Sequence, residues 1–147
     1  MTTVSELLEG KNGAVWTVKP DDTVLHALQI LADKDIGALP VVGASGLVGI
    51  LSERDYARRG ILQGRNSKDT LVRDIMTTSL HSVQPDHPLD RCMSLMTNKH
   101  VRHLPVVDAD GQLVGFISIG DVLKVIIRQL QEHLEKIRLR QTDGFID

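Results

Sequence analysis

The chain has 147 residues, 17 basic and 19 acidic side chains, and a formal net charge of −2. This length fits one compact domain, and the near-balanced charge gives no indication of a strongly basic nucleic-acid surface or a membrane-surface anchor. One tryptophan, one tyrosine and two phenylalanines supply no series of rings on which bases could stack. The single cysteine excludes an internal disulfide and fits a reducing compartment. We therefore predict that the protein has no nucleic-acid partner.

The N-terminus argues against export. Its first residues, M-T-T-V-S-E-L-L-E, carry acids where a signal peptide needs basic residues. No apolar run approaches the roughly 20 residues that cross a bilayer. The sequence therefore predicts a cytoplasmic protein with no membrane partner.

The first half of the chain predicts a short helix at V4-S-E-L-L followed by a β-α-β-β-α unit. A strand is expected at 15–18, and the turn-forming cluster K19-P-D-D-T leads into a helix capped by Asp22 or Thr23. Two β-branched runs at 39–42 and 47–51, joined by G43-A-S-G, are typical of a hairpin. Ser52 then precedes a helix with acids early and basic residues late, the order that a helix dipole favours.

The second half repeats this order after a polar linker at 60–70. A short helix is expected at V72-R-D-I-M, a strand at 80–83, and a helix with Pro88 at its first position. The runs 104–107 and 113–118 predict a second hairpin around D108-A-D-G. Both halves contain V-x-P-D, L-P-V-V and a glycine followed by two apolar residues and S-x-x-D.

A repeat of this length indicates two supersecondary units that share one folded body. We therefore predict an α/β (α+β) fold with two β-α-β-β-α repeats. Residues 1–68 are assigned to the first unit with its N-terminal short helix, and residues 69–147 to the second unit with a long C-terminal helix.

The last helix is expected from 120 to 140, with a tail of no regular structure. It carries a heptad-like apolar series: Leu123, Ile127, Leu130, Leu134 and Ile137. One interpretation is a helix that packs on its own unit and then frays. The other is a self-association surface, which we favour because about twenty helical residues, roughly 30 Å, are too long for so small a unit to cover. The sequence thus predicts a homodimer.

The repeated motifs of the two halves resemble the CBS-domain pair, or Bateman module, in its stand-alone bacterial form. The resemblance rests on L-P-V-V, on G-x-x-x-G-hydrophobic-hydrophobic-S-x-x-D, and on D-I-M-T at 74–77, and it covers nearly the whole chain. It implies two units packed around a pseudo-twofold axis with two clefts between them. It also implies a regulatory module without catalysis or catalytic cofactor, which binds AMP, ADP or ATP, with NAD and S-adenosylmethionine as further candidates, and acts on an unidentified regulated protein.

The two repeated aspartates are the candidate ribose ligands. Asp55 and Asp121 each follow a serine by three residues, just beyond a predicted strand. A carboxylate in this place can accept both ribose hydroxyls, while the helix N-terminus offers free amides to a phosphate. The alternative is that each Ser–Asp pair only caps its helix. The repeated context favours the ligand-binding interpretation.

By resemblance, the cleft of Asp121 is the main nucleotide site. Arg102 and His103 would supply cations to phosphate, and adenine would pack on small residues and on the strand at 15–17. The residues expected in this cleft are Val15, Trp16, Thr17, Ile36, Gly37, Ala38, Arg102, His103, Ile117, Ser118 and Asp121.

The cleft of Asp55 lacks an equivalent basic pair, so Arg54 or Arg58 would have to meet a phosphate. We expect weaker binding, a different ligand or no occupancy there, and a dinucleotide is a further alternative. The residues expected in this cleft are Ser52, Arg54, Asp55, Arg58, Thr77, Thr78, His81 and Val101.

Three other interpretations are weaker. His100 and His103 stand three residues apart, but no cysteine or carboxylate completes a zinc set, so we predict no metal. Cys92 aligns with Ala27 on an apolar helix face, so core packing is favoured over nucleophilic catalysis. With no nucleophile–base pair, the chain is predicted not to be an enzyme. The main rival function is a constitutive interaction or dimerisation module with vestigial clefts.

Overall fold

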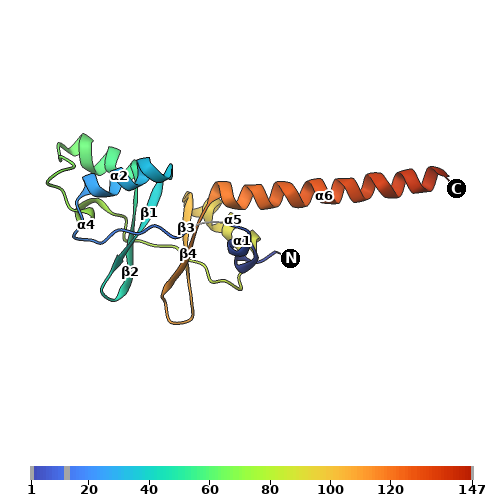
Figure 1. Cartoon of the computed structure of the whole chain (residues 1–147), viewed down its shortest axis with the longest axis horizontal. Helices are drawn as coiled ribbons and strands as arrows, with labels where there is room; N and C mark the ends of the chain where they lie inside the picture. The colour runs from blue at the N-terminus through green and yellow to red at the C-terminus, as the bar shows by residue number, and fades with distance from the viewer. Residues whose placement is uncertain (1, 12–13, 147) are drawn as a thin grey trace.

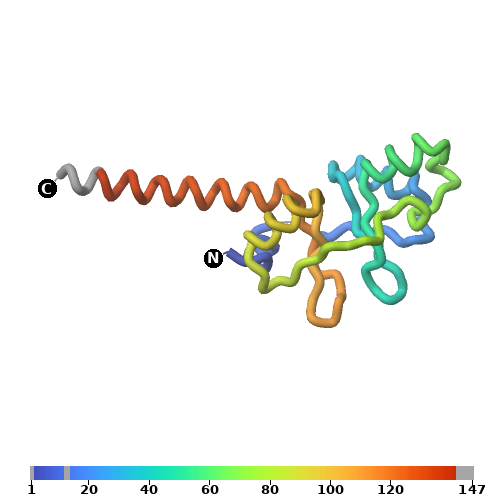
Figure 2. The backbone as a smooth tube through the Cα atoms, turned by 180° about the vertical axis from the view of Figure 1, so that it is seen from behind, coloured from blue at the N-terminus to red at the C-terminus, as the bar shows by residue number. Residues whose placement is uncertain are grey.

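The computed structural model describes residues 2–11 and 14–146. It consists of two small units side by side, each built around a two-stranded antiparallel hairpin, and one long helix that runs away from both (Figure 1). The same arrangement is seen from behind, with the two hairpin loops next to each other (Figure 2). The predicted fold class, a tandem pair of mixed helix–strand units, is confirmed.

In the first unit, β1 (Ala38–Gly43) pairs with β2 (Gly46–Ser52), and Leu39 lies opposite Leu51. Helix α2 (Val24–Lys34) begins after Thr23, whose side chain accepts a hydrogen bond from the His26 N–H at 3.1 Å. The strand expected at 15–18 is reduced to one parallel bridge between Val18 and Val41. Val15 and Trp16 are exposed and line a cleft instead.

The chain after β2 does not form one regular helix. It continues as α3 (Glu53–Asp55), a π-helical turn (Tyr56–Gly60) and a 3₁₀ turn (Ile61–Gln63), and ends at Gly64, which has a positive φ of 74°. A left-handed residue ends a helical segment, and glycine adopts that conformation without steric cost.

The second unit repeats the plan. Helix α5 (Leu89–Lys99) precedes β3 (His103–Val107), which pairs with β4 (Leu113–Ser118). Pro88 is the residue before the helix, one position earlier than predicted, because its ψ of 155° is extended. The strand expected at 80–83 is again one bridge, between Val83 and Val106.

Helix α6 (Ile119–Ile146) follows β4 directly and extends past the predicted end at 140. Val122 is fully buried in the second unit, and Val125 and Ile126 still pack against it. From Ile127 to Gln141 every residue is exposed. The outer part of α6 therefore lies beyond the body of the protein (Figure 1).

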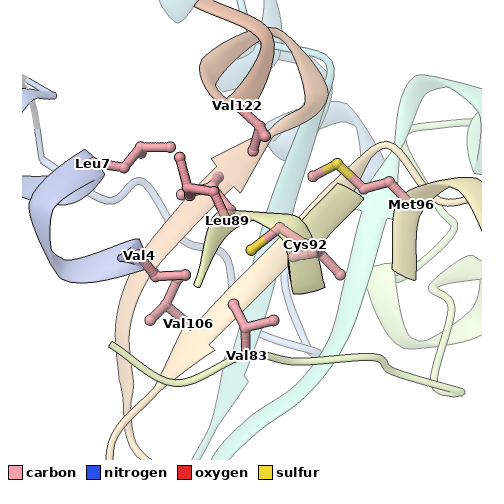
Figure 3. Packing of buried hydrophobic residues seen from close by; sticks show 10 residues of the cluster. Val4, Leu7, Val83, Leu89, Cys92, Met96, Val106 and Val122 are labelled. Carbon is pink, nitrogen blue, oxygen red and sulfur yellow. The ribbon is translucent and has the colours of Figure 1, made fainter. Parts of the chain in front are cut away.

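Each short helix packs on the other unit from the one that it precedes in the sequence. Helix α1 (Val4–Gly10) places Val4 and Leu7 in the core of the second unit, with Val83, Leu89, Cys92, Met96, Val106 and Val122 (Figure 3). Helix α4 (Val72–Ile75) places Val72 and Ile75 in the core of the first unit. The sequence-based division assigned the Val4 helix to the first unit, whereas its packing joins it to the second.

Candidate functional site

Two clefts lie where the units meet, one at each repeated aspartate. The Asp55 cleft has a volume of about 590 Å³, and the Asp121 cleft about 530 Å³. Both aspartates lie in the first turn of a helix that directly follows a strand, as predicted. The polar groups around the two carboxylates differ.

Asp55 is nearly buried, with 9% of its surface exposed. Its Oδ2 accepts hydrogen bonds from the Ser52 N–H at 2.9 Å and from the Ser52 hydroxyl at 3.0 Å. Its Oδ1 accepts a hydrogen bond from the Thr77 hydroxyl at 2.9 Å. Thr77 is held there by backbone pairing with Ile50 at the edge of β2. All these donors are neutral.

Asp121 is bound by a cation. The Lys11 ammonium donates to Asp121 Oδ2 at 2.8 Å and to the Phe116 carbonyl at 2.7 Å, and the Ser118 N–H donates to Asp121 Oδ2 at 2.9 Å. Burial acts to raise the pKa of Asp121, but the hydrogen bonds from Lys11 and Ser118 outweigh it and hold the pKa below its ordinary value. Asp121 is therefore a stable carboxylate at neutral pH.

Arg102 lies in the Asp55 cleft rather than among the residues lining the Asp121 cleft, which corrects its predicted place. Arg102 directly precedes β3, and successive residues of an extended chain point to opposite sides. The next residue, His103, stacks on Phe116 on the Asp121 side, with ring centroids 5.5 Å apart and 9° between the planes. Arg102 thus lines only the Asp55 cleft, whereas His103 lines both clefts.

The charge expected on His103 is also absent at neutral pH. Burial lowers the pKa of this imidazole, and the positive charges of Lys11 and Arg102 add to that effect against the attraction of Asp121. His103 is therefore a neutral ring in the wall of the Asp121 cleft.

Most other predicted residues line their clefts. At Asp121 these are Val15, Trp16, Ile36, Gly37, Ala38 and Ser118, and at Asp55 they are Ser52, Arg54, Thr77, His81 and Val101. Ile117 is not available, because its side chain is fully buried in the core of the second unit. Thr17, Arg58 and Thr78 are not among the lining residues of either cleft.

Several lining residues were missed. Leu80 and His100 line the Asp55 cleft. The repeat could have found Leu80, because it aligns with the predicted residue Val15, whereas His100 aligns with Asp35, which the sequence analysis also missed. Lys34 lies over the Trp16 ring, 4.1 Å from its centroid, at the Asp121 cleft. No sequence feature indicated that Lys11 lines a cleft, since it follows a helix outside the repeated β-α-β-β-α pattern.

Cys92 packs in the core of the second unit, and burial raises the pKa of its thiol to about 11. It is therefore protonated and shielded at neutral pH. Within residues 2–11 and 14–146, no group of three or more His, Cys, Asp or Glu side chains could hold a metal ion. Over the same residues, no helix is both long and apolar enough to span a bilayer.

Comparison with known proteins identifies the repeated unit. The family model of the CBS domain matches residues 11–61 and 72–128. The Arabidopsis thaliana protein named "CBS domain-containing protein CBSX3, mitochondrial" is 37% identical over 98% of this chain and 74% of its own length. The cytoplasmic location therefore stays a prediction.

Two solved structures are similar in fold and sequence. A putative signal-transduction protein with CBS domains from Burkholderia ambifaria is 46% identical, with a TM-score of 0.82 over 86% of this chain and 95% of the other. A structure described as CBSX2 in complex with AMP is 32% identical, with a TM-score of 0.70 over 86% of this chain and 96% of the other.

Proposed function

Because the chain belongs to the CBS-domain family, we propose that it is a regulatory module that binds an adenine nucleotide between its units and passes that event to a partner protein. The observation that carries the proposal is the combination of a ribose-type acceptor, Asp55, with two arginines, Arg54 and Arg102, in one cleft of about 590 Å³. The similar structure with bound AMP supports an adenosyl ligand.

The Asp55 cleft is the better phosphate site of the two. The Asp55 carboxylate would accept the ribose hydroxyls in place of the Thr77 hydroxyl, which is neutral and free to rotate to another acceptor. Arg54 and Arg102 carry planar, permanently charged donors suited to phosphate oxygens. Leu80, Val101 and Ile50 offer apolar surface to the adenine ring. We therefore propose the Asp55 cleft as the main nucleotide site, in place of the Asp121 cleft that the sequence predicted.

AMP, ADP and ATP are the ligands that this chemistry fits best. Phosphate gains two guanidinium partners in the cleft, whereas the sulfonium of S-adenosylmethionine would be repelled by them. NAD has the same ribose and phosphate groups and is the second choice. We infer binding without chemical turnover, with the nucleotide changing the relative position of the two units.

Isothermal titration with AMP, ADP, ATP, NAD and S-adenosylmethionine tests this proposal. Asp55→Asn should weaken AMP binding about tenfold or more, since it removes charge-assisted hydrogen bonds to ribose. Arg102→Gln should weaken ATP more than adenosine. Asp33→Asn, which changes an exposed aspartate outside both clefts, is the matched control. No heat from any ligand at millimolar concentration would refute the sensor and leave a constitutive interaction module.

We also propose that the protein is a homodimer joined through α6. The predicted heptad-like seam is exposed: Leu123, Ile127, Leu130, Leu134 and Ile137. Ile126 is the last α6 residue that packs on the core of the second unit; Gln129 hydrogen-bonds Thr2, but the apolar side chains from Ile127 onward are exposed. A second copy with the same seam supplies a matching apolar face.

Light scattering after gel filtration tests the dimer. The wild-type protein should have about twice the 16.2 kDa chain mass, and Leu130→Asp/Leu134→Asp should have the chain mass itself. The control is Leu62→Asp, which changes another exposed leucine outside α6. Leu130 and Leu134 lie outside the core, so the melting temperature of the double variant should be close to that of the wild type. A monomeric wild type would refute this interface.

A further inference from the structure

The two cleft aspartates are bound by residues in equivalent places but of different charge. Thr77 follows α4, the short helix packed on the first unit, and donates to Asp55. Lys11 follows α1, the short helix packed on the second unit, and donates to Asp121. One exchanged helix therefore brings a neutral hydroxyl to its carboxylate, and the other brings an ammonium.

The Lys11 ammonium occupies the group that a ribose needs. It contacts both Asp121 Oδ2, at 2.8 Å, and the Phe116 carbonyl, at 2.7 Å. A ribose that binds through both carboxylate oxygens must compete at Oδ2 with a charged donor, which forms stronger hydrogen bonds than a neutral hydroxyl. An uncharged adenosyl ligand would leave the displaced ammonium without a counter-charge in a partly buried cleft.

A phosphate removes that penalty. The other described cations of this cleft are less available: Lys34 lies over the Trp16 ring, and burial keeps His103 neutral. Lys11 is long and half-exposed, with 39% of its side chain accessible, so it can move from Asp121 to a phosphate oxygen without unfolding its surroundings.

We propose that Lys11 is an exchangeable occupant of Asp121 that makes this cleft select phosphorylated over uncharged adenosyl ligands. Ribose binding releases the ammonium from Asp121, and the ligand phosphate then accepts its hydrogen bonds. In the Asp55 cleft the corresponding group is Thr77, which adds no such penalty for an uncharged ligand. This inference rests on the proposed nucleotide-binding function and extends it to the second cleft.

Trp16 allows the Asp121 cleft to be observed separately. It is the single tryptophan of the chain and lines the Asp121 cleft but not the Asp55 cleft. Its fluorescence is therefore a local reporter, while calorimetry reports both clefts. The experiment titrates AMP and adenosine into the full chain and follows both signals.

The informative variant is Lys11→Met, which keeps the length of the side chain and removes its charge. The Kd for AMP should rise about tenfold, because a charge-assisted contact is lost, and the Kd for adenosine should fall, because Asp121 no longer has a competing donor. Lys11→Arg should retain the preference for AMP. Lys68→Met is the matched control, because Lys68 is exposed and lines neither nucleotide cleft nor the groove that contains Lys11 and Asp121.

Opposite changes for the two ligands support the proposal, provided that the melting temperature is close to that of the wild type. Tighter binding of both ligands would show that Lys11 only blocks the cleft, and weaker AMP binding with unchanged adenosine would show a simple phosphate contact. Either result overturns the proposed movement of Lys11 from Asp121 to the ligand phosphate. Calorimetric heat with no change in Trp16 fluorescence also overturns it while leaving the Asp55 site intact. No heat at all would refute the proposed function.

Discussion

Replacing Val4 with alanine should destabilise the second unit, although Val4 is near the start of the chain. Its side chain is fully buried in the core that also holds Val83 and Leu89 (Figure 3). Val4→Ala removes two methyl-sized groups, worth about 1.6 kcal/mol of transfer free energy at 0.8 kcal/mol each, and leaves a cavity that adds to the loss. We expect a loss of about 2 kcal/mol in the free energy of unfolding.

Urea unfolding measures the total loss, and hydrogen exchange with mass spectrometry locates it. Amides of α5 and β4 should exchange faster, whereas those of α2 and β1 should change little. Val15→Ala is the control, because Val15 is 39% exposed and its truncation should cost less than about 0.5 kcal/mol. Faster exchange confined to the first unit would refute the exchanged packing of α1.

Three further predictions concern the clefts and the core. Gly49→Ala should weaken AMP binding and lower the melting temperature, because the added Cβ would lie 2.7 Å from the Met76 sulfur and 3.0 Å from the carbonyl of Thr77; an unchanged Kd would show that the Thr77 edge has room to move. The wild type should be more stable than Asp121→Asn above the ordinary pKa of 3.8, and this advantage should disappear as the pH falls through the lower pKa of the folded state. Urea unfolding at a series of pH values measures the difference in the free energy of unfolding. An advantage that persists in acid would contradict the ion pair. Finally, the Cys92 thiol should react with iodoacetamide at pH 8 only in denaturant, since burial raises its pKa to about 11; rapid labelling of the native protein would contradict its place in the core.

The local elements were predictable because their causes are local in the sequence. Two β-branched runs and the turn-forming G43-A-S-G predict the first hairpin, which the structure forms over Ala38–Gly43 and Gly46–Ser52. Thr23 caps its helix as one of the two predicted caps. The two repeated aspartates are found in the first helical turn because Ser-x-x-Asp is itself a capping pattern.

The distribution of cations between the clefts was not predictable in this way. Arg102 and His103 are neighbours in the sequence, yet Arg102 lines only the Asp55 cleft, whereas His103 lines both clefts and stacks on Phe116. Their separation depends on how the start of β3 is oriented between the two units. Sequence spacing carries no information about that orientation.

The sequence by itself thus determined the repeat, the hairpins and the two candidate carboxylates, because each follows from short-range periodicity, capping and turn chemistry. Only the tertiary structure decided which unit each short helix completes and which hydrogen-bond donor meets each carboxylate. Those contacts join residues as distant as Lys11 and Asp121. They depend on the packing of α1 into the second core, where apolar burial rather than proximity along the chain selects the partner.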